Sequence, residues 1–193
     1  MNIKKYILLK NSTILSSPGL FSIFLSLVSI PIHLNIAGTE NYGNYIIFHF
    51  ILIFSTIFNF GIGKSITVSI NNFPKKNKEI AYEGLKYTFS VIIILISFFY
   101  ILSYIEKSLF LSNLITSSYL IFVIIGLIIS VIFSRFEGIF QGNHKFKSLS
   151  FYNFVFFSLS LSLPSLSLYY YNDFKLKDLI IFSLSIKLFT IIF

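Results

Sequence analysis

The chain has 193 residues, of which 55% are hydrophobic and only 11% are charged, and its mean hydropathy is +0.84. A soluble domain carries about 25% charged residues, so this composition excludes a water-coated globular protein and predicts that the bilayer surrounds most of the chain. The absence of cysteine excludes disulfides and thiol chemistry. The formal net charge of +8 is better explained by basic loops that fix membrane topology than by nucleic-acid binding.

The apolar runs predict membrane helices rather than the strands of a barrel. Each run is about 20 residues long, the length that a helix needs to cross the hydrocarbon, and none alternates between polar and apolar residues as barrel strands do. We therefore predict an all-α polytopic membrane protein in which residues 1–193 form a single transmembrane lobe, a six-helix bundle. The predicted spans are approximately 14–34, 45–70, 87–104, 114–133, 149–171 and 179–193.

The basic residues predict that the N-terminus lies in the cytoplasm. In that orientation eleven basic residues lie on the inner side and three in the outer loops, which is the bias of the positive-inside rule. The inner residues are Lys4, Lys5, Lys10, Lys64, Lys75, Lys76, Lys78, Lys86, Arg135, Lys145 and Lys147, and the outer ones are Lys107, Lys175 and Lys177.

Polar side chains recur at helical spacing within most of the spans. In the first span they follow each other at intervals of three and four residues and therefore share one helix face. Two interpretations stay open: small and hydroxyl residues pack helices together, or several stripes converge on a water-filled cavity. The stripes are Gly19, Ser22, Ser26, Ser29 and His33; His49, Thr56, Asn59, Gly63 and Thr67; Gly126, Ser130 and Ser134; Asn153, Ser160, Pro164 and Ser167; and Ser183, Lys187 and Thr190.

Ionisable residues within a membrane are candidates for function. Lys187 lies about eight residues into the sixth span, where it either meets an anionic group of a substrate or snorkels along the helix. Lys64 is expected to snorkel, whereas Arg135 is expected to bond to a neighbouring helix or to lipid head groups. His33 and His49 are expected to be hydrogen-bonding packing residues more often than proton relays.

Motifs of catalysis are missing from the sequence. It has no GxSG with a partnering histidine, no HExxH zinc motif and no phosphate-binding GxxxxGK[ST] loop. We therefore expect no catalytic residues, no metal and no cofactor, and the sequence favours transport or scaffolding over an enzyme.

Three stretches carry a resemblance to a known family. They are "NIAGTENYGNY" at Asn35–Tyr45, "NFGIGKS" at Asn59–Ser65 and "EGIFQGNHKFKSLS" at Glu137–Ser150. The chain resembles the N-terminal half of polysaccharide flippases, the Wzx-type O-antigen and repeat-unit translocases of the multidrug, oligosaccharidyl-lipid and polysaccharide exporter superfamily. Asn59 stands where that family often has aspartate. We expect the glycines of the first stretch to form a tight turn at the membrane edge, with Tyr42 and Tyr45 as interfacial anchors, and Gly61 and Gly63 to allow close helix approach or a local break.

The resemblance implies a location in the bacterial inner membrane and a lobe that pairs with a missing C-terminal lobe around a central cavity. Because the chain stops within an apolar run, we expect it to be a fragment or a truncated product. The implied function is translocation of a polyprenyl-pyrophosphate-linked oligosaccharide, with membrane lipids as further partners. The candidates for lining the substrate cavity are Lys187, Lys64, Arg135, Asn59, Ser26, Ser29 and His49.

Three alternatives to the flippase stay open. A multidrug antiporter of the same superfamily would usually show intramembrane acidic residues, which this sequence does not place in mid-membrane. A membrane enzyme of glycan assembly would need a large outer loop or clustered catalytic residues. A scaffold without transport activity is compatible with the composition alone.

Overall fold

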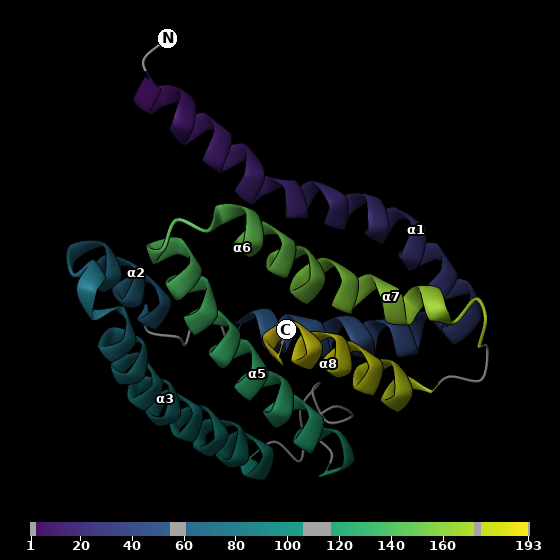
Figure 1. The fold of residues 1–193 in the computed structure, drawn as a ribbon. Helices are drawn as coiled ribbons and strands as arrows, with labels where there is room; N and C mark the ends of the chain where they lie inside the picture. Colours follow the sequence, from purple (N-terminus) through teal and green to yellow (C-terminus); the bar gives the residue numbers. More distant parts are fainter. Residues whose placement is uncertain (1–2, 55–60, 106–116, 172–174, 193) are drawn as a thin grey trace.

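The computed structural model describes residues 3–54, 61–105, 117–171 and 175–192, and every regular element in these ranges is helical (Figure 1). This confirms the predicted all-α class. In chain order the elements are α1 (Ile3–Phe54), α2 (Ile62–Asn72), the 3-10 turn η2 (Pro74–Lys76), α3 (Asn77–Ile105), α5 (Ser117–Gly142), α6 (Phe146–Asn153), the π-helix η3 (Phe154–Leu159), α7 (Ser160–Ser167) and α8 (Leu176–Ile192).

The helix α1 is two arms joined at a sharp turn. A straight helix of 52 residues would measure roughly 78 Å at 1.5 Å per residue, far more than the roughly 30 Å of hydrocarbon. Figure 1 shows the chain turning back on itself instead. The turn is at Gly38, whose φ of 81° and ψ of 167° lie in a region open essentially to glycine alone. The turn predicted from the glycines of this stretch is therefore present, and Gly38 makes it.

The second predicted span, 45–70, is interrupted in the structure. The second arm of α1 ends at Phe54, and α2 begins after Gly61, which has a left-handed φ of 72°. A left-handed residue cannot continue a right-handed helix, so a continuous helix over this range is wrong. Of the two alternatives for Gly61 and Gly63, the local break applies to Gly61.

Close approach applies to Gly63, which begins a seam between α2 and α5. A Cβ atom on Gly138 would lie 2.3 Å from the carbonyl oxygen of Gly63, and a Cβ on Gly142 would lie 2.8 Å from the Cβ of Ile70. The hydroxyl of Thr67 donates to the carbonyl of Gly138 at 3.1 Å. Small residues at four-residue spacing thus bring the two backbones together, as in packed membrane helices.

The first arm of α1 packs along the composite helix formed by α6, η3 and α7. The hydroxyls of Ser17 and Ser150 lie 3.2 Å apart, and Ser158 donates to the carbonyl of Pro18 at 3.2 Å. Figure 1 shows these elements running side by side, with α8 on the other side of α7. Serine hydroxyls that lie outside the predicted polar stripes therefore join the helices at these contacts.

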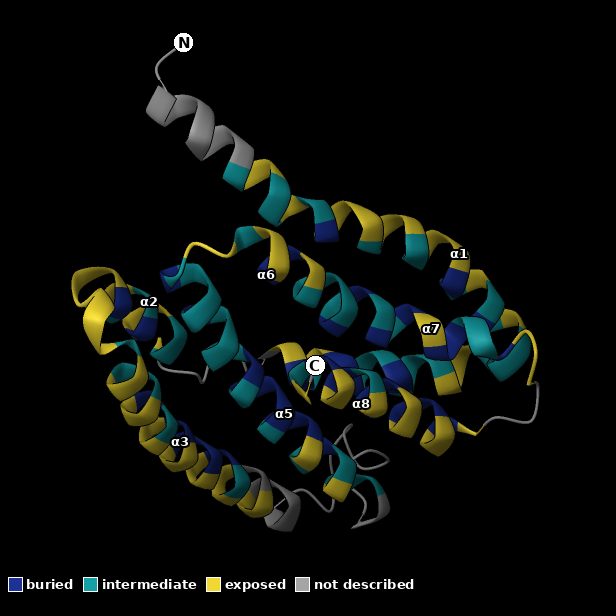
Figure 2. Cartoon of the chain, in the orientation of Figure 1, coloured by how far each residue is buried: buried dark blue, intermediate teal, exposed yellow. Residues whose placement is uncertain are grey.

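Large apolar side chains lie exposed on the outer surface of the molecule. Figure 2 shows exposed residues along α1 and α3, and they include Phe21, Phe24, Phe89, Ile93 and Ile101, each more than half exposed. Four stretches within the described ranges are long and apolar enough to cross a membrane, namely Asn11–Ile53, Pro74–Phe98, Tyr119–Gly142 and Phe146–Ser167. The protein is a multi-pass membrane protein whose lipid-facing surface replaces the charged surface of a soluble domain.

Candidate functional site

Lys187 is buried inside the lobe. Its side chain is only 2% exposed, and it shares the inner face of α8 with the buried Ser183 and Thr190. Its ammonium lies 4.4 Å from the ring centroid of Phe156 and 5.9 Å from that of Phe157, within the range of a cation–π interaction. The side chain does not extend along α8 to the membrane surface, so the snorkelling interpretation does not describe it.

The two rings beside Lys187 belong to the π-helix η3. A π-turn has an extra residue per turn and often marks a functional site. Here two consecutive residues of one helix, Phe156 and Phe157, both reach the same ammonium. Phe156 also stacks on Phe133 of α5, with ring centroids 3.8 Å apart and planes 8° apart. The ammonium is therefore held against aromatic faces that are fixed by a second helix.

A second ionisable residue, His49, is buried against the same helix as Lys187. His49 is 5% exposed, and its Nε2 is 3.2 Å from the hydroxyl of Ser183, which lies one helical turn before Lys187 on α8. Its ring is 4.7 Å from that of Tyr45. The prediction that His49 packs through a hydrogen bond agrees with this contact. The second arm of α1 and α8 thus meet through polar side chains rather than through apolar ones alone.

Tyr45 corrects one prediction of the sequence. It is fully buried, and its hydroxyl donates to the carbonyls of Ser160 and Leu161 at 3.2 and 3.0 Å. These two carbonyls directly follow the π-helix. The prediction that Tyr45 anchors the protein at the membrane interface is therefore wrong, because the tyrosine instead joins α1 to α7 within the core.

His33 extends these contacts on the first arm of α1. Its Nδ1 is 2.8 Å from the hydroxyl of Ser165, and its ring is 5.2 Å from that of Tyr45. Its Nε2 is buried without a hydrogen-bond partner among the described residues. We call His33, Tyr45, His49, Ser183 and Lys187 the polar column.

A cavity of about 210 Å³ approaches the polar column from the C-terminal end of α8. It is lined by Thr190, one helical turn beyond Lys187, and by Phe133. Phe133, which lines the cavity, stacks on Phe156, and Phe156 in turn contacts the ammonium of Lys187.

The structure does not bring the predicted cationic residues together. Arg135 points toward α3, where its guanidinium donates to the carbonyl of Ala81 at 2.5 Å, so the prediction of a bond to a neighbouring helix is met. Lys64 lies exposed on α2. Of the other candidates, Ser26 is half-buried, Ser29 is buried, and Asn59 lies outside the described residues.

Sequence reasoning missed the aromatic part of the site. Phe156, Phe157 and Phe133 are three of 25 phenylalanines, and nothing in their spacing distinguishes them. The four-residue spacing of Tyr45 and His49, and again of Ser183 and Lys187, places each pair on one helix face. That spacing is the signal from which a shared polar face could have been found.

The arrangement suits the binding of negative charge. A cation in a medium of low dielectric attracts an anion more strongly than it would in water. The hydroxyl of Thr190 donates to the carbonyl of Ile186 at 2.8 Å and that of Ser183 contacts His49, so Lys187 is the group that would attract the anion. A bound anion would also reduce the cost of keeping the ammonium away from water.

Comparison with known proteins agrees with the resemblance noted in the sequence. The chain matches the family model described as "polysaccharide biosynthesis protein" over residues 8–189. No curated protein and no solved structure matches it. Since this match covers nearly the whole chain, the protein belongs to the polysaccharide biosynthesis protein family, which includes the Wzx flippases, and has a role in polysaccharide biosynthesis or transport.

Proposed function

We propose that the chain forms a lobe of a flippase that moves a polyprenyl-pyrophosphate-linked oligosaccharide from the inner to the outer leaflet of the bacterial cytoplasmic membrane. The protein makes and breaks no bond in this process. The lipid tail stays in the bilayer while the pyrophosphate and the sugars pass through a polar cavity between this lobe and a second one. Two lobes that rock against each other open the cavity to each leaflet in turn.

The observation that carries the proposal is the burial of Lys187. It is a cation inside the membrane lobe of a chain that belongs to this family. An intramembrane charge is costly and marks a substrate or ion pathway by default. The pyrophosphate of the substrate is the anion that this lysine would bind. The cavity that ends one helical turn away at Thr190 is the route by which the head group would approach, once the Phe133–Phe156 stack opens.

The orientation of the chain is part of the proposal. The excess of basic residues in alternate loops favours a cytoplasmic N-terminus. We expect a periplasmic reporter fused after Asn41, close to the turn at Gly38, to be active, and a cytoplasmic reporter fused after Lys76 to be active. If only the exchanged reporters are active, the topology is the reverse of the proposed one and the basic loops lie outside.

Removal of the protein from cells separates the flippase from the other classes. We expect surface polysaccharide to fall at least tenfold and the completed lipid-linked oligosaccharide to accumulate, because synthesis continues while translocation stops. The measurement is mass analysis of extracted lipid-linked sugars together with staining of surface polymer. An incomplete or unmodified sugar unit would instead indicate an enzyme of glycan assembly. Altered drug sensitivity with normal surface polymer would indicate an antiporter.

A further inference from the structure

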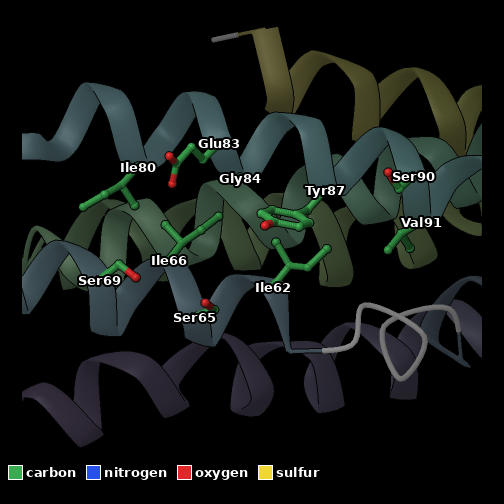
Figure 3. A pocket seen from close by; sticks show the side chains of 10 residues that line it. All are labelled: Ile62, Ser65, Ile66, Ser69, Ile80, Glu83, Gly84, Tyr87, Ser90 and Val91. Atoms are coloured by element: carbon green, nitrogen blue, oxygen red, sulfur yellow. The ribbon is translucent and has the colours of Figure 1, made fainter.

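A second and larger cavity lies between α2 and α3, away from the polar column. It measures about 400 Å³. Figure 3 shows Ile80, Glu83, Tyr87 and Val91 of α3 facing α2 across this space. Gly84 forms part of its floor, where a Cβ would lie 2.7 Å from the Cδ1 of Ile66. We call this space the α2–α3 groove.

Exposed apolar side chains beside the α2–α3 groove indicate that it faces the bilayer. Tyr87, one of its lining residues, is 67% exposed, and the adjacent Phe89 and Ile93 are 58% and 64% exposed. An apolar surface of this kind faces lipid in a membrane protein. From Ile80 to Val91 the groove follows α3 for roughly 16 Å at 1.5 Å per residue, which suits an extended hydrocarbon chain lying along a helix.

The charged residue of the groove lies toward the end nearest the start of α3. Glu83 lies one helical turn before Tyr87, where the predicted third span begins, and Ser69 lines the facing part of α2. Figure 3 shows the carboxylate of Glu83 directed into the space between the two helices. At the predicted orientation this end is at the level of the lipid head groups of the inner leaflet.

The charges at this end have a defined pattern. Among the ten residues that line the groove, the charged side chain is the carboxylate of Glu83. Exposed lysines lie near it in the sequence: Lys78 at the start of α3, and Lys86 three residues after Glu83, with its ammonium 5.2 Å from the ring centroid of Tyr82. A purely anionic head group would meet the carboxylate unfavourably. A head group with a primary ammonium next to a phosphate matches both signs, since the carboxylate accepts from the ammonium and the lysines attract the phosphate.

We propose that the α2–α3 groove binds a phospholipid of the inner leaflet whose head group carries a primary ammonium, as phosphatidylethanolamine does. One acyl chain lies between Ile62, Ile66 and Val91, and the ammonium donates hydrogen bonds to Glu83. This inference is independent of the transported substrate. It concerns a lateral lipid site, and a choline head group would not fill it equally well because it has no N–H to donate.

The test is native mass spectrometry of the protein, purified from bacterial membranes in detergent and exposed to equal amounts of phosphatidylethanolamine, phosphatidylcholine and phosphatidylglycerol. We expect phosphatidylethanolamine to be retained roughly threefold to tenfold more than either other lipid, since tenfold corresponds to about 1.4 kcal/mol and one charge-assisted hydrogen bond is of this order. Glu83→Gln is expected to remove this preference. Ser65→Phe, which narrows the groove from an exposed position, is expected to lower retention of the bound lipid itself.

Glu79→Gln is the matched control. Glu79 lies one turn earlier on α3, is exposed, pairs with Lys76 at 3.7 Å and does not line the groove, so its variant should keep the wild-type preference. Equal retention of the three lipids by the wild-type protein would overturn the proposal. So would a preference for phosphatidylglycerol that Glu83→Gln does not change, because the lysines Lys78 and Lys86 alone would then explain it. Failure to retain any lipid would indicate that another part of the protein covers the groove, and would also overturn it.

Discussion

Gly138→Leu is expected to remove folded protein from the membrane. At this position a Cβ atom would lie 2.3 Å from the carbonyl oxygen of Gly63 and 2.9 Å from its Cα. Both are backbone atoms, so no change of rotamer relieves the overlap, and α2 and α5 must separate. Overpacking of this kind costs about 1–3 kcal/mol and sometimes more, and here we expect the upper end because the Thr67–Gly138 hydrogen bond is lost as well.

The measurement is the amount of monodisperse protein recovered in detergent, together with its thermal unfolding. Gly19→Leu is the matched control, since Gly19 lies within a helix and no atom outside its own helix lies within 4 Å of a Cβ built there. We expect the control to accumulate as the wild-type protein does. Equal recovery of the two variants would show that the α2–α5 seam is not as close as described.

Lys187→Met is expected to reduce export of surface polysaccharide roughly tenfold to a hundredfold while leaving the amount of protein unchanged or raised. Methionine keeps most of the volume of the side chain and its contact with Phe156, but it removes the charge. A hydrogen bond to a charged group is worth about 1.5–3 kcal/mol, and each 1.36 kcal/mol of barrier changes a rate tenfold. Stability should not fall, because a buried cation costs free energy that a buried thioether does not.

Lys177→Met is the control for this variant. Lys177 lies on the same helix but is exposed, near the ring of Phe122, so its replacement should leave export unchanged. Export that survives Lys187→Met at wild-type protein levels would remove this lysine from the transport mechanism. A parallel fall of export and of protein amount would assign Lys187 to packing.

Much of the fold follows from the sequence because membrane insertion leaves few choices. Long apolar runs with little charge predict helices, since backbone groups must be satisfied within each segment in lipid. The turn within Asn35–Tyr45 was also predictable, because glycine has no Cβ and can adopt the positive φ of 81° that Gly38 has at the turn. The packing interpretation of the stripe at Gly126 and Ser130 also agrees with the structure, where Gly126 lies against Leu52 and Leu184.

The site was less predictable because it depends on how helices are rotated about their axes. A tyrosine after a membrane-edge turn is typical of an interfacial anchor, yet Tyr45 faces inward and bonds to carbonyls that follow a π-turn in another helix. No residue pattern in Phe154–Leu159 signals that π-turn. The directions of Lys187 and Arg135 likewise depend on which neighbouring helix each side chain meets, and this cannot be read from spacing along one segment.

The most direct test of the proposed function is translocation in vesicles. The lobe, reconstituted together with the second lobe that the proposal requires and with a fluorescent polyprenyl-pyrophosphate-linked oligosaccharide, should make the inner-leaflet sugar accessible to a membrane-impermeant quencher or glycosidase added outside, at a rate well above that of empty vesicles. Vesicles that contain Lys187→Met should be slower by the same factor as export in cells, and Lys177→Met should match the wild-type protein. Sugar that stays protected in wild-type vesicles at the rate of empty ones would contradict the assignment of this protein as a flippase.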